Sequence, residues 1–176
     1  MNSLLINENK FLPVINTQFS FFGGHSETVE PGWYWPPEHQ PAFELMYIIS
    51  GRQRTVTETA DLLLNPGDIT IIPVEYNHTS YCVGTSPMLY FSMHFNLDDP
   101  TVRFLLIQYF TNRIITPDNS IYQDLKKRVE NIMRITKDDY TVKDKLDIQI
   151  NVINIFNILA EVAHSSLQNI PQQGVQ

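Results

Sequence analysis

Turn-forming residues interrupt the first half of the chain so often that only short elements fit between them. Between Phe11 and Phe95 these breaks recur about every eight to twelve residues. They are Gly23-Gly24, Pro31-Gly32, Pro36-Pro37, Gly51, Pro66-Gly67, Asn77 and Gly84. Breaks at this spacing are typical of many short antiparallel strands, so the sequence predicts a mainly β fold here.

The segments between the breaks are rich in β-branched and aromatic residues, which favour strands. We expect strands at 43–50, 53–57, 61–64, 69–72 and 88–95. Apolar runs such as LMYII and ITII indicate strands that are buried on both faces or that line a filled barrel. A small closed barrel is therefore favoured over an open sheet.

Helical signals replace strand signals after residue 96. Asp99 directly before Pro100 is typical of a helix start. The apolar periodicity that follows predicts helices over about 101–112, 120–135 and 142–164. The chain is thus expected to be mainly β with helices at its C-terminal end.

The last predicted helix carries two apolar stripes, and two stripes need two partners. One stripe is Ile148, Val152, Ile155, Leu159 and Val162. The other is Leu146, Ile150, Ile153 and Phe156. We expect one stripe to cover the barrel and the other to form a homodimer through this C-terminal helix. In the alternative, both stripes pack against the two preceding helices.

Composition narrows the class of partner. The formal net charge is −7 and the 12 Lys and Arg residues are scattered, so this segment lacks the basic face that phosphate binding needs. Cys82 is the single cysteine and cannot form an internal disulfide. Because the sequence shows no leader-like start and no run of about 18 apolar residues, we predict a cytoplasmic protein with no membrane partner.

Two short motifs contain residues that can bind a ligand or a metal. The first is HQPAFE, from His39 to Glu44, and the second is PGDITIIPVEYNH, from Pro66 to His78. Together they resemble the paired motifs of the cupin superfamily. The resemblance implies a cupin-like double-stranded β-helix (jelly-roll) barrel in which His39, Glu44 and His78 converge.

The motifs depart from the cupin pattern at two positions. Pro37 occupies the position of the first histidine, and Glu75 occupies the position of a glycine. Because the pattern thereby loses one of its four protein ligands, we predict no metal and no other cofactor. If a divalent metal binds, His39, Glu44 and His78 are its candidate ligands, since three nitrogen and oxygen ligands can hold a metal with an open position.

The longer segment FELMYIISGRQRTVTETADLLLNPGDITIIPVEYNHTSY resembles the amino-terminal sensing domain of AraC-type transcription regulators, over about residues 15–165. The resemblance implies an N-terminal arm and barrel at 1–96, a helical dimerisation segment at 97–165, and the start of a linker at 166–176. DNA binding then belongs to a domain absent from this chain. The partners of the chain itself are a small-molecule effector and a second copy.

Strand alternation orders the candidate ligand contacts. In the strand 88–95 it places Tyr90, Ser92 and His94 on one face, where polar-tipped side chains are expected to line the cavity. His94 is interpreted as a hydrogen-bonded core residue. Two tryptophans upstream of the first motif suit a pocket wall. The predicted ligand-binding residues are His39, Glu44, His78, Ser80, Tyr90, Ser92, Trp33 and Trp35.

No serine or cysteine stands in a nucleophile arrangement, so we predict no catalytic residues and no enzyme. The hypothesis is the ligand-sensing and dimerisation domain of a bacterial AraC-type regulator, with a sugar as a candidate effector. Two alternatives stay open. One is a metal-dependent cupin enzyme such as a dioxygenase or a sugar isomerase, and the other is a stand-alone sugar-binding cupin.

Overall fold

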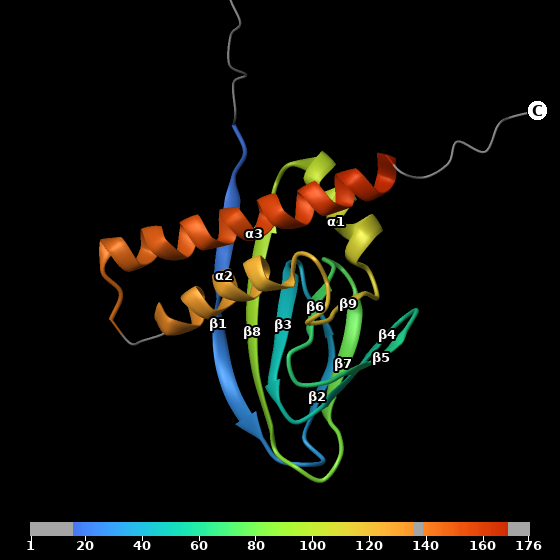
Figure 1. The fold of residues 1–176 in the computed structure, drawn as a ribbon. Helices are drawn as coiled ribbons and strands as arrows, with labels where there is room; N and C mark the ends of the chain where they lie inside the picture. Colours follow the sequence, from blue (N-terminus) through green and yellow to red (C-terminus); the bar gives the residue numbers. More distant parts are fainter. Residues whose placement is uncertain (1–15, 136–138, 169–176) are drawn as a thin grey trace, which may run out of the picture.

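Two antiparallel sheets face each other and form the barrel (Figure 1). The computed structural model describes residues 16–135 and 139–168. One sheet has five strands in the order β1-β8-β3-β6-β9, and the other has four in the order β2-β7-β4-β5. The strands are β1 (Phe19–Val29), β2 (Tyr34–His39), β3 (Phe43–Ser50), β4 (Gln53–Thr57), β5 (Asp61–Leu64), β6 (Ile69–Ile72), β7 (Asn77–Cys82), β8 (Met88–Leu97) and β9 (Ile114–Ile115).

The five strands predicted from the sequence are confirmed, and so is the mainly β fold class, with two facing antiparallel sheets followed by three helices. Four predicted strands keep the predicted bounds, and the fifth, β8, continues to Leu97. Strands β1, β2, β7 and the short β9 were not predicted from the sequence. The first two were hidden because they contain turn-forming residues in their interior.

The glycine pair in β1 marks a β-bulge rather than a turn. The pairing of β1 with β8 shifts register between Phe21 and Gly23, and Gly23 has a positive φ of 114°. A Cβ atom on Gly24 would lie only 2.8 Å from the backbone oxygen of Ser92 and 2.9 Å from Cβ of Met93. Glycine is therefore required here by a bulge and a close backbone approach inside a strand.

The proline pair in β2 is tolerated because β2 is an edge strand of its sheet. The pairing of β2 with β7 shifts register between Trp35 and Glu38, so Pro36 and Pro37 lie in an irregular segment that does not need ladder hydrogen bonds. The shift also changes which side chains of β2 face the barrel interior.

Three helices follow the barrel: α1 (Pro100–Phe110), α2 (Tyr122–Ile135) and α3 (Val142–Gln168). The predicted start of the first helix is confirmed, because the side chain of Asp99 accepts hydrogen bonds from the backbone N–H groups of Thr101 (2.9 Å) and Val102 (3.0 Å). The third helix is longer than predicted and crosses the outer face of the five-stranded sheet, with α2 beside it (Figure 1).

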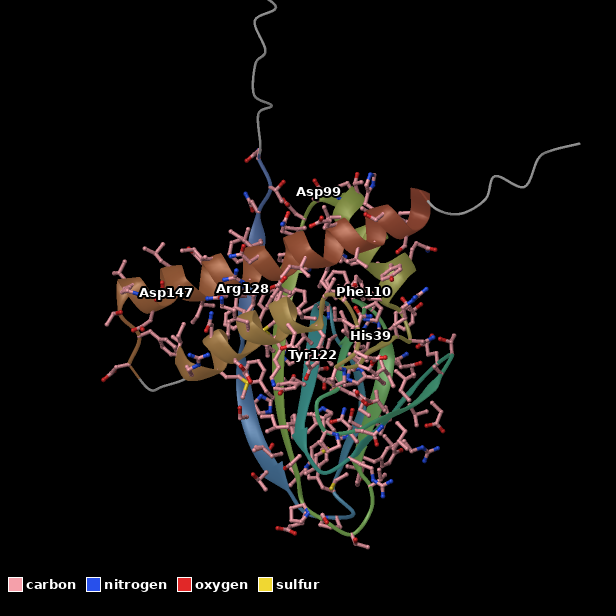
Figure 2. All side chains as sticks on the ribbon, in the orientation of Figure 1. His39, Asp99, Phe110, Tyr122, Arg128 and Asp147 are labelled. Carbon is pink, nitrogen blue, oxygen red and sulfur yellow. The ribbon has the colours of Figure 1, made fainter. Side chains whose placement is uncertain are left out.

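The main hydrophobic core lies between the five-stranded sheet and the helices. Alternate residues of β3 and β8 point outward into it, and Phe110 of α1 and Tyr122 of α2 meet them where the helices adjoin the barrel (Figure 2). The outward-facing strand residues are Phe43, Leu45, Tyr47, Phe91, Met93 and Phe95. A smaller core inside the barrel contains Val29, Ile48, Leu64, Cys82, Met88 and Tyr90.

The two stripes of α3 have different environments. On the first stripe the buried side chains are those of Ile148, Val152, Ile155 and Leu159, as expected for a stripe that packs against the rest of the domain. On the second stripe the side chains of Leu146, Ile150 and Ile153 are about half exposed. Val142, one turn before Leu146, is more exposed than these three. Phe156 was assigned to this second stripe, but it is buried with its ring 5.2 Å from that of Phe95.

The whole of α3 is also apolar enough to be compared with a membrane-crossing helix. By length and composition alone, Val142–Ser166 could cross a membrane, although the sequence shows no continuous apolar run of that length. Core helices of soluble proteins can have the same length and composition. One face of α3 packs against α1, α2 and the sheet, as a core helix does.

Two predicted segments lie partly outside the described residues. Residues 1–15 of the predicted arm-and-barrel segment and residues 169–176 of the predicted linker lie outside the described residues. The helices from Pro100 to Gln168 share one core with the sheet.

Candidate functional site

A cavity lies inside the barrel between the two sheets, with an empty volume of ≈ 430 Å³ that includes its opening. Side chains of β1, β3 and β8 line it from the five-stranded sheet, and side chains of β2, β4 and β7 line it from the other. The lining residues are His25, Trp33, Trp35, Glu38, Gln40, Glu44, Met46, Gln53, His78, Ser80, Tyr90, Ser92 and His94.

The strand register explains why these side chains meet. Glu44 of β3 pairs across the ladder with His94 of β8, and Met46 pairs with Ser92, so all four point to the same face. His78 and Ser80 alternate along β7 in the same way. The face opposite to the helix-covered core therefore supplies the polar lining.

One end of the cavity contains a buried charged group, the Glu44 cluster, made of Glu44, His78, Ser92 and His94. Oε2 of Glu44 lies 3.0 Å from Nε2 of His78, and Oε1 lies 3.6 Å from Nε2 of His94. The hydroxyl of Ser92 donates a hydrogen bond of 2.5 Å to Oε1 of Glu44. Only 5% of Glu44 is exposed, so a carboxylate is held inside the barrel by the groups around it.

The protonation of the Glu44 cluster follows from these contacts. Burial raises the pKa of Glu44, but pairing with His78 and His94 outweighs burial and lowers the pKa from 4.5 to about 2. Burial lowers the pKa of His78, yet its interaction with Glu44 leaves that pKa raised above 6.5. Interaction with Glu44 likewise raises the pKa of His94. The cluster is thus a carboxylate beside two imidazoles that favour the charged form.

A neutral polar network lies beside the cluster. The side-chain amide of Gln53 donates to Oγ1 of Thr55 at 2.8 Å and to Oγ of Ser80 at 3.3 Å, and the two hydroxyls are 3.2 Å apart. Gln53 and Ser80 are both almost fully buried. Since the three groups satisfy one another, they hold this part of the lining in one arrangement.

The other end of the cavity has an aromatic wall, made of Trp33, Trp35 and Tyr90. The ring of Trp33 lies 5.8 Å from that of Tyr90 and 6.3 Å from that of Trp35. Each outer ring is held by a carboxylate. The indole N–H of Trp35 donates to Glu38 at 2.5 Å, and the hydroxyl of Tyr90 donates to Glu27 at 3.1 Å. Burial and the bond to Glu27 raise the pKa of Tyr90.

The structure places seven of the eight predicted ligand-binding residues on the cavity lining, and His39 is the exception. These seven are Trp33, Trp35, Glu44, His78, Ser80, Tyr90 and Ser92. Their role as ligand contacts stays a prediction, since placement alone does not establish binding.

His39 lies on the exposed side of β2, where its Nε2 is 3.1 Å from a carboxylate oxygen of Glu75 and its side chain is 54% exposed. The bulge at Pro36-Pro37 is the reason, because it puts Glu38 rather than His39 opposite His78. The predicted inward direction of His39 was therefore wrong.

Several lining residues were missed or misinterpreted. His94 was interpreted as a hydrogen-bonded core residue, but it lines the cavity and its Nε2 has no hydrogen-bond partner among the described residues. Gln53, Glu38 and His25 were not singled out. The alternation that placed Tyr90 and Ser92 inward also indicated His94, whereas the inward direction of Glu38 depends on the bulge, which the sequence does not reveal.

The donor set does not match a metal centre of the cupin type. His39 is directed away from Glu44 and His78, so the three predicted ligands do not meet. Within residues 16–135 and 139–168, no group of three or more His, Cys, Asp or Glu side chains is arranged to hold a metal ion. The oxygens of Glu44 instead contact His78, His94 and Ser92 directly.

Comparison with solved structures finds barrels of low similarity. A predicted oxalate decarboxylase from Thermotoga maritima is 18% identical, with a TM-score of 0.38 over 40% of this chain and 63% of that one. An RmlC-like cupin with a double-stranded β-helix fold from Methanocaldococcus jannaschii is 14% identical, with a TM-score of 0.39 over 40% of this chain and 66% of that one. A DMSP lyase from Ruegeria pomeroyi is 17% identical, with a TM-score of 0.38 over 55% and 43%.

The aligned parts span less than two-thirds of the length of these three proteins. No curated protein matches the chain. The family model of the AraC-like ligand binding domain matches residues 26–136. This match begins in β1 and includes all of α2, and it covers more than half of the 176 residues. The chain belongs to the family of AraC-like ligand binding domains.

Proposed function

We propose that this chain is the effector-binding and dimerisation part of a cytoplasmic AraC-type transcription regulator. The observation that carries the proposal is the cavity, in which a buried carboxylate, two histidines and an aromatic wall are enclosed by a domain of the AraC-like ligand-binding family. Effector binding there biases the arrangement of two copies, and DNA is contacted by a domain outside this chain.

The lining supports a small hydroxylated effector. It combines apolar ring faces with a few converging polar groups, as ligand pockets generally do. The side chains of Ser80, Ser92 and Gln53 offer neutral hydrogen-bonding groups, and the charge of Glu44 is already balanced by histidines. A sugar, the candidate effector predicted from the sequence, belongs to this class.

The proposed dimer surface is the exposed stripe of α3, composed of Val142, Leu146, Ile150 and Ile153. Four half-exposed or more exposed apolar side chains on successive turns form a continuous patch, and such patches mark association surfaces. We therefore assign the stripe to a second copy of this chain.

A short path connects the cavity with the stripe. His94 and Phe95 are neighbours on β8, so His94 faces the cavity while Phe95 faces the helices and contacts Phe156 of α3. A shift of β8 on effector binding would therefore act directly on α3. Such coupling requires that the effector bind the two arrangements with different affinity.

A non-enzymatic role is part of the proposal. A metal-dependent cupin enzyme would need ligands that the structure does not bring together, since His39 lies at the surface beside Glu75. Among the described residues the cavity lining holds no cysteine and no serine with a histidine at hydrogen-bond distance from its hydroxyl.

A reporter assay tests the proposal. The chain is fused to a DNA-binding domain that binds its operator only as a dimer, and repression of a reporter gene is measured. We expect repression by the wild-type fusion and its loss in Ile150→Glu and Ile153→Glu, because a charge on the stripe opposes burial. The matched control is Leu63→Glu, an equally exposed apolar residue on β5 in the other sheet, which should leave repression unchanged. A wild-type fusion that does not repress would contradict the dimer.

A further inference from the structure

Two buried polar atoms of the Glu44 cluster retain hydrogen-bonding capacity within the described part of the chain. Nε2 of His94 makes no hydrogen bond, and Oε2 of Glu44 makes none of good geometry, although it is ion-paired with Nε2 of His78 at 3.0 Å. The carboxylate oxygen can only accept, and the imidazole nitrogen can donate when it carries a proton. One ligand hydroxyl can satisfy both atoms, because it donates one hydrogen bond and accepts another. Unpaired polar atoms that are this deeply buried are uncommon in native proteins.

The aromatic wall offers a second recognition element of a different kind. Its three rings line the cavity, with neighbouring centroids 5.8 and 6.3 Å apart. The faces of aromatic rings attract organic cations. The cation–π pairs within the described residues use the rings of Tyr81, Tyr109 and Tyr122, so the protein's own cations do not occupy the wall.

The charges around the wall point to a positive ligand rather than a negative one. Glu38 contacts Trp35 and Glu27 contacts Tyr90, so two carboxylates border the rings. Among the described residues, no Lys or Arg lines the cavity. His78 and His94 face Glu44, and Nε2 of His25 lies 3.3 Å from the hydroxyl of Tyr90. Arg54 of β4 lies at the surface, where it forms an ion pair with Asp61 at 2.7 Å.

The two recognition elements belong to one cavity. Glu44, His94 and the three aromatic rings are all among its 13 lining side chains, and its empty volume of ≈ 430 Å³ includes the opening to solvent.

We propose that the effector is a small hydroxylated organic cation, an amino alcohol whose hydroxyl binds between Glu44 and His94 while its ammonium group contacts Trp33, Trp35 and Tyr90. This inference rests on the proposed effector-binding function and narrows it to one chemical class. A sugar would satisfy Glu44 and His94 but would leave the carboxylates around the aromatic wall without a positive partner.

Tryptophan fluorescence provides a site-specific test, because the chain contains only two tryptophans and both line the cavity. Choline chloride is titrated into the purified chain, and a saturable change in emission is expected. The uncharged isostere 3,3-dimethylbutan-1-ol should bind at least about tenfold more weakly, because it lacks the charge that the rings recognise. Equal binding of the two compounds, or no response to choline at millimolar concentration, would overturn the inference.

Variants of Trp35 test whether the aromatic wall itself binds choline. Their binding is measured by calorimetry, because each variant removes one of the two tryptophan fluorophores. Trp35→Leu should weaken choline binding roughly tenfold, and Trp35→Phe should recover part of it. Trp35 is 47% exposed, so folding should tolerate both changes. Glu161→Gln, at an exposed position on α3, is the charge control and should bind as the wild type does.

L-Arabinose is titrated in parallel to separate the inference from the proposed function. Binding of arabinose without binding of choline would refute the amino alcohol and leave the effector-binding function standing. The dimer-dependent reporter assay is independent of both ligands, so its failure would count against the proposed function alone.

Discussion

The two faces of the five-stranded sheet use alternate residues of the same strands for opposite purposes. On β8, Phe91, Met93 and Phe95 are fully buried against the helices, whereas Ser92 and His94 between them face the cavity. On β3, Leu45 belongs to the core and Glu44 to the cavity. Neighbouring residues of one strand thus serve stability and ligand recognition in turn. A register slip of one residue would turn the core side chains toward the cavity and the polar side chains toward the helices.

The largest effect is expected on the outward face. Phe95→Ala removes a fully buried ring that contacts Phe43 and Phe156, and it should lower the free energy of unfolding by about 3–5 kcal/mol. Urea denaturation followed by circular dichroism measures the loss. A loss below about 1 kcal/mol would show that this face is not the main core.

A smaller effect is expected on the inward face, where Glu44→Gln keeps the shape and removes the charge. The variant should lose about 1–3 kcal/mol, because it weakens hydrogen bonds to a charged group. Denaturant unfolding near pH 6 measures this difference. Ser92→Ala, which removes one donor to the same carboxylate, should cost less than Glu44→Gln.

The pH dependence of stability sharpens the same comparison. The folded-state pKa of Glu44 is lowered from 4.5 to about 2, so its contribution is present above pH 4.5 and is lost as the pH falls toward 2. The folded-state pKa values of His78 and His94 are raised, so their contribution is present below pH 6.5 and is lost as the pH rises through those values. The stabilisation by the cluster is therefore greatest between about pH 4.5 and 6.5.

Unfolding free energies at a series of pH values test this profile. The wild type should lose stability on both sides of the window, and Glu44→Gln should show a flatter profile because the histidines lose their partner. Superimposable profiles of the two proteins would contradict the charged cluster.

The smallest effect is expected at Glu75, outside both faces. Glu75 occupies the glycine position of the cupin motif and has a positive φ of 65°. Glu75→Gly should raise the free energy of unfolding by less than about 1 kcal/mol, because glycine adopts this conformation without steric cost and the exposed pair with His39 that is lost contributes little. Asn112→Gly is the matched control. Asn112 also has a positive φ, of 59°, but its side chain donates a 2.7 Å hydrogen bond to Thr59, so no gain is expected there. Thermal unfolding compares the two variants.

Alternation made much of the site predictable. Once the strand 88–95 was recognised, its period of two put Tyr90, Ser92 and His94 on one face, and the structure places all three on the cavity lining. The paired motifs placed Glu44 and His78 in the same barrel, and the structure brings them within 3.0 Å. Regular strands transmit this information because their geometry is fixed.

Irregular segments contain most of the residues whose placement was not predicted from the sequence. Gly23 and Gly24 are typical turn residues in sequence, yet they occupy a bulge, because β8 approaches the backbone closely. The bulge in β2 turns His39 outward and Glu38 inward, and such a register change depends on the partner strand rather than on local sequence. Phe156 is buried because it lies over Phe95, a contact that helical periodicity alone does not specify.

The most direct test of the account is the titration of the imidazole side chains of His78 and His94 by NMR. We predict that both titrate with pKa values above 6.5, and that both pKa values fall in Glu44→Gln, since the carboxylate is the group that raises them. Values for His78 and His94 at or below 6.5 in the wild type, or unchanged in Glu44→Gln, would contradict a ligand site built around the Glu44 cluster.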